Sequence, residues 1–309
     1  MSRVEEALRR AAAAPIPVDV SSQIPEPAAE RHVRSVLEHY PHEDRIPPDA
    51  TASRDLTRML PAGLSGRFSE RAVAARFGEA YRGKLVATCD ASPASVGQYR
   101  RLAAVVYHLQ VEQGLRTLMV SSSVPREGKT LTVVNLATTL SESYKRRVLL
   151  IDADLLRPSI HDVFGISNGY GLWDALGSEP CELQFSRVSP TLWVLPAGSG
   201  GANPMAVLAS QRMERLLDGV SSSFDCVLLD APPVAHMADA GLLARLIRAV
   251  IVVIGAGSTP YALVEKVVAE LGREHIIGTV LNRIEEDATG WSAQYAGYDA
   301  PAEPASLSR

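Results

Sequence analysis

The sequence predicts an α/β protein whose sheet is doubly wound and mostly parallel. From residue 117 onward, short apolar runs alternate with segments in which apolar residues recur at helical spacing. The runs are almost continuous in valine, leucine and isoleucine, which is typical of strands buried on both faces of a parallel sheet. Because such sheets bind ligands at the carboxyl ends of their strands, we expect the functional residues there.

The expected strands are 117–122, 147–153, 191–196, 225–230, 250–254 and 278–282. The expected helices between them are 129–145, 204–222, 237–248 and 260–274, and another helix at 95–114 precedes the first strand. Together they predict one domain over 91–288.

Residues 1–90 have a different composition and predict a largely irregular N-terminal extension or linker with short helices. Ser2 and Glu5 have the spacing of a capping box at the start of one such helix. Prolines then follow at 15, 17, 25, 27, 41, 47, 48 and 61, and proline at this density removes backbone donors and blocks helices. At the other end, 289–309 is expected to be a flexible tail.

Composition excludes several classes of protein. The net charge of −4 argues against broad nucleic-acid binding. The three cysteines are widely spaced and form no Cys-x-x-Cys pattern, which favours a reducing compartment without structural zinc. No apolar run reaches about 18 residues and no signal peptide opens the chain, so we expect a soluble protein or one that reaches a membrane through a partner.

A phosphate-binding loop is predicted at 121–130, which reads Ser-Ser-Ser-Val-Pro-Arg-Glu-Gly-Lys-Thr between a strand and a helix. Backbone N–H groups of such a loop and of the following helix point at phosphate oxygens. Lys129 is expected to reach the β- and γ-phosphates and Thr130 to bind Mg²⁺. Ser123 replaces the usual first glycine, so only the Gly-Lys-Thr half of the motif is present. The predicted nucleotide-binding residues of this loop are Pro125, Glu127, Gly128, Lys129, Thr130 and Leu131.

Carboxylates follow two of the other expected strands. Asp152 and Asp154 end the strand at 147–153, where their expected work is Mg²⁺ coordination through water and general-base activation of a hydroxyl. The alternative is that one of them caps the next turn. Asp230 ends the strand at 225–230 and is the expected second metal-holding carboxylate, so the predicted metal ligands are Thr130, Asp152 and Asp230.

Asn282 ends the last expected strand. Its amide has the donor and acceptor needed to pair with an adenine edge, but asparagine at a strand end is also a common turn residue. Both interpretations remain open from the sequence.

The segment from about Tyr99 to Asn282 resembles the bacterial protein-tyrosine kinases (BY-kinases) of exopolysaccharide and capsule biosynthesis. The matching motifs are Ser-Ser-x-x-Pro-x-Glu-Gly-Lys-Thr (121–130), Leu-Ile-Asp-Ala-Asp-Leu (150–155), Arg-Pro-x-x-His (157–161) and Leu-Asp-Ala-Pro-Pro-Val (229–234). The opening residues are similar to forms encoded with exosortase-type loci. The resemblance covers about two thirds of the chain and implies a P-loop NTPase fold.

The resemblance also implies an activity and its participants. It implies an ATP- and Mg²⁺-dependent tyrosine autokinase that regulates polysaccharide polymerisation and export, with Lys129, Asp152 and Asp154 as catalytic residues. It implies a cytoplasmic protein recruited to the inner face of the membrane by a separate co-polymerase, or chain-length-determinant protein, that activates it. Tyr295 and Tyr298 in the tail are the expected phosphorylation sites, and association with further copies of the chain is left open.

Three departures from the family pattern stand beside the resemblance. Leu156 occupies a position that is commonly arginine, and Arg157 lies one residue later. Of the three positions of the family's assembly helix, which correspond here to Gly97, Arg100 and Ala103, one keeps its arginine. The tail carries two tyrosines where relatives carry a dense cluster.

Two other functions therefore remain as alternatives. A catalytically weak, ATP-binding scaffold of the same machinery is favoured by these departures. A partition or positioning ATPase of the same fold is opposed by Val124, which stands where those proteins carry a second lysine; Arg126 is a weak substitute.

Overall fold

The computed structural model describes residues 68–73, 77–88, 90–177, 183–201, 203–236 and 240–284. The expected helix near Ser2, most of the predicted extension, and the tail with Tyr295 and Tyr298 lie outside these ranges.

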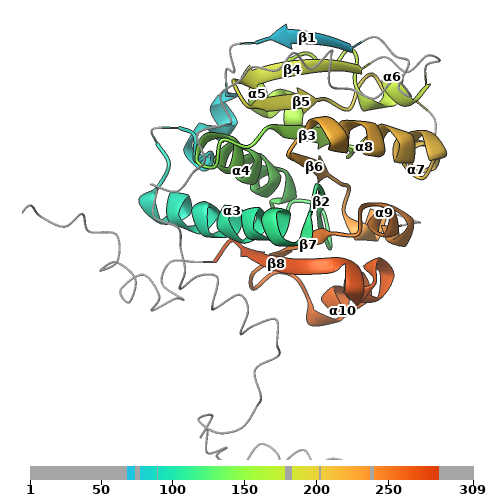
Figure 1. The fold of residues 1–309 in the computed structure, drawn as a ribbon. Helices are drawn as coiled ribbons and strands as arrows, with labels where there is room; N and C mark the ends of the chain where they lie inside the picture. The colour runs from blue at the N-terminus through green and yellow to red at the C-terminus, as the bar shows by residue number, and fades with distance from the viewer. Residues whose placement is uncertain are drawn as a thin grey trace, which may run out of the picture. The chain divides into compact units, whose positions relative to one another are not determined.

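An eight-stranded sheet runs through the described part of the chain, in the order β1-β4-β5-β3-β6-β2-β7-β8 (Figure 1). All neighbouring strands pair in parallel except β4 and β5, which are antiparallel. The strands are β1 (Phe68–Ala72), β2 (Thr117–Ser122), β3 (Val148–Asp152), β4 (Leu183–Ser189), β5 (Leu192–Leu195), β6 (Cys226–Asp230), β7 (Val250–Gly255) and β8 (Ile276–Asn282).

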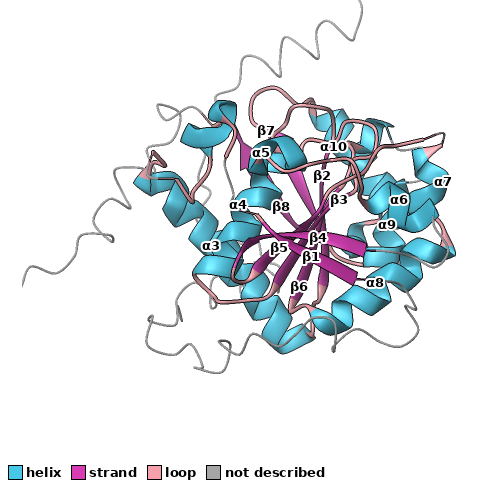
Figure 2. Ribbon diagram, turned by 90° about the horizontal axis from the view of Figure 1, so that it is seen from above, coloured by secondary structure: helices cyan, strands magenta, loops and turns pink. Residues whose placement is uncertain are grey.

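Helices cover both faces of this sheet, as the view along it shows (Figure 2). The α-helices are α3 (Pro93–Gln113), α4 (Lys129–Glu142), α5 (Ile160–Phe164), α6 (Leu172–Gly177), α7 (Pro204–Leu208), α8 (Gln211–Ser223), α9 (Ala240–Ile247) and α10 (Tyr261–Leu271). Short 3-10 helices are η4 (Glu79–Lys84), η5 (Val234–His236) and η6 (Arg273–His275). The predicted doubly wound α/β fold is confirmed.

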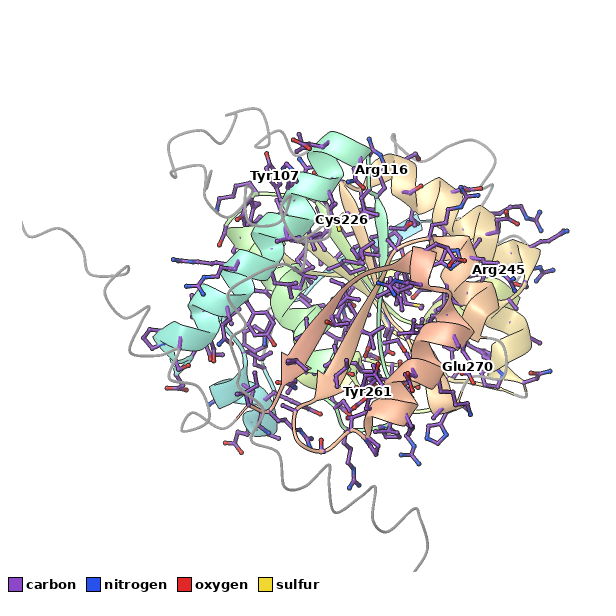
Figure 3. The ribbon with its side chains drawn as sticks, turned by 90° about the horizontal axis from the view of Figure 1, so that it is seen from below. Tyr107, Arg116, Cys226, Arg245, Tyr261 and Glu270 are labelled. Atoms are coloured by element: carbon purple, nitrogen blue, oxygen red, sulfur yellow. The ribbon has the colours of Figure 1, made fainter. Side chains whose placement is uncertain are left out.

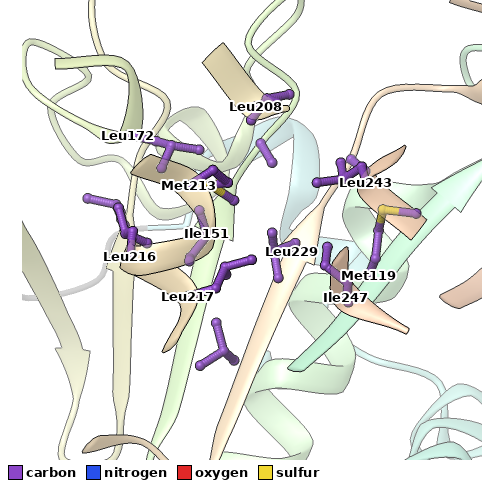
Figure 4. Packing of buried hydrophobic residues seen from close by; sticks show 14 of the residues in the cluster. Met119, Ile151, Leu172, Leu208, Met213, Leu216, Leu217, Leu229, Leu243 and Ile247 are labelled. Atoms are coloured by element: carbon purple, nitrogen blue, oxygen red, sulfur yellow. The ribbon is translucent and has the colours of Figure 1, made fainter. Parts of the chain in front are cut away.

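Two hydrophobic cores lie on opposite faces of the sheet, because successive side chains of a strand point to opposite sides. On β2, Leu118 and Val120 pack with α3, α4 and α5, whereas Met119 packs with the helices α6 to α10. Figure 4 shows the second core, in which Ile151 and Leu229 of β3 and β6 meet leucines of α8. The central strands are therefore buried on both faces, and their ends are held in fixed positions.

The sheet begins earlier in the chain than the sequence predicts. β1 lies within 1–90, the predicted extension, yet pairs in parallel with β4. The segment after η4 also docks on α4: the Val86 N–H donates to Asn135 Oδ1 at 2.9 Å, and Asn135 Nδ2 donates to the Lys84 carbonyl at 3.0 Å. Leu85 between them is buried.

The remaining elements follow the expected ones closely, apart from the additional short helices α5 and α6 and two further differences. The expected helix at 204–222 is two helices, α7 and α8, because Ser210 leaves the helical conformation and accepts the Met213 N–H with its side chain as the N-cap of α8. β4 was not predicted, since it carries polar residues along half its length and pairs against β5 near one edge of the sheet.

Cys226 is a free, buried thiol at the start of β6, and Figure 3 shows it beneath α3. Burial raises the pKa of this thiol to about 12, so it is an inert core residue at neutral pH. Among the described residues, no helix is both long and apolar enough to cross a membrane.

The opposite, amino-terminal ends of β3 and β6 are joined by an ion pair. Asp225 accepts the Arg147 backbone N–H at 2.9 Å and the Arg147 guanidinium at 3.1 Å. Burial alone would raise the pKa of Asp225, but the hydrogen bonds from Arg147 outweigh burial and hold it below its usual value. The pair therefore stabilises the fold while Asp225 is ionised.

Replacing Asp225 by asparagine should lower the free energy of unfolding by about 1–2 kcal/mol at pH 7, because hydrogen bonds to a charged group are lost. The native pKa lies below the unfolded one, so the difference from wild type should be full above about pH 4–5 and vanish as pH falls through the native pKa. Urea unfolding from pH 7 to pH 3 measures it. Asp218→Asn, an exposed carboxylate on α8, is the control. A difference that does not change with pH would contradict the assignment.

Candidate nucleotide-binding site

The strand order brings the predicted site residues to one edge of the sheet. β6 lies between β3 and β2, with Asp152 opposite Asp230 and Asp230 opposite Val120 in the register. The loop that follows β2 thus meets the carboxylates that end β3 and β6. Segments about 100 residues apart in sequence form one site because parallel strands carry them to the same edge.

The loop after β2 has an open helix end. Gly128 has φ +95° and is the N-cap of α4, with no side chain hydrogen-bonded there. The first N–H groups of α4 are therefore available to an anion, and the helix dipole favours negative charge at this end. Pro125 lies in the loop, half-buried, and Arg126 at its exposed tip also has positive φ. The Leu131 side chain packs on the core beneath α4, which leaves only its backbone near the loop.

Lys129 lies at the centre of a buried cluster of charges. Its Nζ is 2.8 Å from Asp154 Oδ2 and 3.2 Å from Asp230 Oδ1. The Thr130 hydroxyl donates to the other oxygen of Asp230 at 2.6 Å. Lys129, Asp154 and Asp230 are all buried, so this single ammonium group compensates carboxylates that water does not reach.

Electrostatics in the cluster leave an excess of negative charge. Burial alone would lower the pKa of Lys129, but Asp230 and Asp154 raise it above its usual value, so the ammonium is charged. Burial and the neighbouring Asp230 raise the pKa of Asp152 to about 7, and burial also raises the pKa of Asp230. A further cation at this edge would relieve the repulsion between the carboxylates.

Asp152 differs from its neighbours in its partners. Its Oδ1 accepts the Asp154 N–H at 3.2 Å, and its Oδ2 accepts the N–H groups of Ser159 and Ile160, both at 3.0 Å. Both oxygens thus hold the backbone of the turn that connects β3 to α5. This is the capping interpretation left open by the sequence, whereas Asp154 directs one oxygen at Lys129 and takes the Arg157 N–H on the other at 3.1 Å.

Hard oxygen ligands for Mg²⁺ are present at the expected place. The Thr130 hydroxyl and the Asp230 carboxylate lie together, and Ser159 Oγ is 3.4 Å from Thr130 Oγ1. No group of three or more metal-binding side chains forms within the described residues. Mg²⁺ commonly takes one or two protein ligands and completes its shell with water and phosphate oxygens, so the Thr130 and Asp230 oxygens could hold it.

Glu127 and Asn282 are in direct contact. Asn282 Nδ2 donates to the Glu127 carbonyl at 2.8 Å, and a Cβ at Gly128 would overlap the same amide. The Glu127 carboxylate accepts hydrogen bonds from the Gly255 N–H at the end of β7 and from the Thr259 hydroxyl in the β7–α10 loop. The adenine role of Asn282 stays a prediction. Ser159 and Thr259 carry no motif that would have pointed to them.

Leu156 occupies the turn beside Asp154 and is 51% exposed. An exposed apolar side chain therefore stands two residues after Asp154. Tyr295 and Tyr298 are not among the described residues.

The fold and the site together define a class of protein. The family model for the CobQ/CobB/MinD/ParA nucleotide binding domain matches residues 126–295, so the chain is a nucleotide-binding protein of this P-loop class.

The particular family follows from individual relatives. The chain is 31% identical over 189 residues to the tyrosine-protein kinase YwqD of Bacillus subtilis, which covers 60% of this chain and 79% of YwqD. It is 29% identical over 222 residues to the tyrosine-protein kinase wzc of Salmonella typhimurium, covering 70% of this chain but 30% of wzc. The chain belongs to the bacterial tyrosine-kinase (BY-kinase) family, which confirms the resemblance seen in its motifs.

Solved kinase domains have the same architecture. The kinase domain of Escherichia coli tyrosine kinase ETK matches with a TM-score of 0.59 and 28% identity, over 63% of this chain and 78% of that one. The VpsO kinase domain matches with a TM-score of 0.52 and 30% identity, over 63% of this chain and all of the other.

Lys129→Met should weaken ATP binding about ten- to a hundredfold, because a charge-assisted hydrogen bond to phosphate is lost. It should also lower the stability of the free protein by about 3 kcal/mol, since buried carboxylates lose their only ammonium partner among the described residues. Burial raises the pKa of Asp152 and of Asp230, so protonation of these two carboxylates should relieve part of this loss at pH 6, and the loss should grow toward pH 8.

Titration calorimetry and urea unfolding measure the two effects. Lys266→Met removes an exposed lysine of α10 and should change neither. An ATP affinity in Lys129→Met equal to that of the wild-type protein would show that this loop is not part of the nucleotide site.

Proposed function

We propose that the chain is an ATP- and Mg²⁺-dependent protein-tyrosine autokinase that regulates exopolysaccharide or capsule polymerisation and export. The observation that carries the proposal is the convergence of Lys129, Asp154, Asp230 and Thr130 at the open end of α4. Phosphoryl transfer needs little else from a protein than positioning and neutralisation of charge. The relatives named tyrosine-protein kinases give the acceptor class.

In this proposal the charges of the cluster rearrange when nucleotide binds. Phosphate oxygens at the α4 end take Lys129 as partner, since it is the buried cation nearest to that end. Thr130 and Asp230 would hold Mg²⁺ through their side-chain oxygens. When bound, Mg²⁺ would neutralise negative charge on the transferred phosphoryl group. Lys129 then no longer neutralises Asp154, so the oxygen it leaves is free to accept a proton.

Asp154 is therefore our candidate for the general base. A tyrosine hydroxyl has a pKa near 10 and needs a positioned carboxylate to take its proton as its oxygen bonds to the γ-phosphorus and the bond to the bridging oxygen breaks, releasing ADP. Asp152 has both oxygens committed to backbone N–H groups and fits a positioning role, in which it holds the turn that carries Asp154.

The partner follows from the family rather than from the site. Relatives such as wzc are longer than this chain, which spans 30% of wzc. We propose that a separate membrane co-polymerase activates this chain and recruits it from the cytoplasm to the inner face of the membrane.

One observation favours a second candidate, the catalytically weak scaffold. Leu156 is half-exposed beside Asp154 and adds no positive charge at a point where phosphoryl transfer develops negative charge. A scaffold would bind ATP through Lys129 and Thr130 without phosphorylating the tail, so the two candidates separate in a phosphorylation assay.

The two aspartates after β3 should separate in a paired test. Asp154→Asn should lower the rate of phosphotyrosine formation by about a hundredfold or more, with an unfolding midpoint close to wild type. Asp152→Asn should lower both the stability and the rate of phosphotyrosine formation. In the wild-type protein, backbone N–H groups donate to both carboxylate oxygens, and the asparagine amide would place its own N–H group against one or more of these donors.

The measurements are anti-phosphotyrosine detection and thermal unfolding. Asp162→Asn, an exposed carboxylate nearby, is the control and should leave both unchanged. Wild-type rates in Asp154→Asn would exclude it as the base.

Tyr295 and Tyr298 should be phosphorylated by a neighbouring copy of the chain. A Lys129→Met protein mixed with an active Tyr295→Phe/Tyr298→Phe protein should gain phosphate on the tail of the inactive copy. Each phosphate adds about −1.5 to −2 charge, which should loosen any assembly that depends on the tail.

Mass spectrometry of the mixture with ATP and Mg²⁺ locates the label. Label absent from the inactive copy, while wild-type protein labels its own tail, would exclude transfer between molecules. No label on wild-type protein, with ATP binding intact and the co-polymerase's cytoplasmic segment present, would favour the scaffold.

A further inference from the structure

Glu127 is the one carboxylate in the phosphate loop, and both of its oxygens accept hydrogen bonds from the protein. It is 3% exposed, and its Oε2 accepts the Val124 N–H of the same loop at 2.9 Å. Its Oε1 accepts the Gly255 N–H at 3.1 Å and the hydroxyl of Thr259. One side chain thus closes the segment 124–127 of the phosphate loop and connects it to Gly255 at the end of β7 and to Thr259 in the β7–α10 loop.

A second set of contacts closes this connection. Asn282 Nδ2 donates to the Glu127 carbonyl at 2.8 Å, and the Asn282 carbonyl accepts the Ala256 N–H at 2.8 Å. The phosphate loop, the β7–α10 loop and the end of β8 are therefore held together by hydrogen bonds at both the carboxylate and the backbone of Glu127.

Burial makes these contacts strong and makes their loss costly. A carboxylate that accepts several N–H and O–H donors away from water forms charge-assisted hydrogen bonds, about twice as strong as neutral ones. The phosphate loop includes Arg126 and Gly128 with positive φ, conformations that a free loop would seldom hold together. A contact with a segment outside the loop can fix such a shape, and Glu127 provides one through Gly255 and Thr259.

We infer that Glu127 is a positioning residue that holds the phosphate loop in its anion-binding shape before nucleotide arrives, by anchoring it to the β7–α10 loop through Gly255 and Thr259. Affinity then gains because the loop does not have to be ordered during binding. The inference rests on nucleotide binding in the proposed function but not on tyrosine transfer.

The sharpest variant is Thr259→Val, which keeps the shape of the side chain and removes one hydroxyl donor to Glu127. Thr259→Ser restores the hydroxyl. Ser258→Ala is the matched control, because its hydroxyl donates within the same loop to the Gly255 carbonyl at 3.1 Å and does not touch Glu127. Glu127→Gln is the stronger variant, since it removes the charge and turns an acceptor into a donor.

Hydrogen exchange of the free protein tests the inference without nucleotide. Thr259→Val should speed exchange of the amides of 124 and 126–128 about tenfold, while the unfolding midpoint stays near wild type. Thr259→Ser and Ser258→Ala should exchange like wild type. Unchanged exchange in both Thr259→Val and Glu127→Gln would overturn the inference, whatever the protein binds.

Calorimetry with ADP and with inorganic pyrophosphate gives the functional readout. Thr259→Val should weaken both ligands by a similar factor, about five- to twentyfold, because the phosphate loop contacts the part they share. If only ADP binding were weakened, Thr259 would act on the nucleobase instead of the phosphate loop, and the inference would be overturned. Failure of wild-type protein to bind ADP would refute the proposed function, and the exchange result would still decide the role of Glu127.

Discussion

The contact on which the site depends is between one buried ammonium group, that of Lys129, and the carboxylates of Asp154 and Asp230. Parallel strands bring their carboxyl ends to one edge of the sheet. Acidic side chains that follow these strands therefore lie close together, at the same edge where ligands bind. Without a cation the acids would repel one another in a place that water does not reach. With Lys129 among them, the free protein keeps the site folded in the geometry that phosphate later uses.

Several other features follow from that requirement. The Asp152 carboxylate accepts hydrogen bonds from three backbone N–H groups. These bonds fix the turn and therefore the distance between Asp154 and Lys129. Gly128 must be glycine, both for its positive φ and because the Asn282 amide occupies the space of a side chain. Glu127 then holds the loop that carries Lys129. Each of these residues acts on the ammonium group through the backbone rather than through direct contact.

The sequence predicted the central part of the molecule well, because long valine- and leucine-rich strands and a Gly-Lys-Thr loop carry strong local signals. Its predictions were weaker where tertiary contacts decide the structure. β1 and β4 carry several polar residues, and only their pairing near the edge of the sheet makes them strands. Asp152 and Asp154 share one motif, and nothing in it shows that one binds backbone while the other faces Lys129. Gly255 and Thr259, which donate to the Glu127 carboxylate, lie more than 120 residues from it in sequence, a separation that no local pattern reports.

The separation of the site residues along the chain has a consequence for how the protein is made. Thr130 and Asp230 are 100 residues apart, and Asn282 is 155 residues from Glu127. Contacts between such distant segments form late in folding, after the entropy of closing long loops has been overcome. A chain still emerging from the ribosome has the phosphate loop but not its acidic partner, so it cannot yet bind nucleotide in this way. Nucleotide at a hundred times its dissociation constant would then add about 2.7 kcal/mol to the completed fold and none to the partial one. Nucleotide thereby becomes a selective stabiliser of chains that have finished folding.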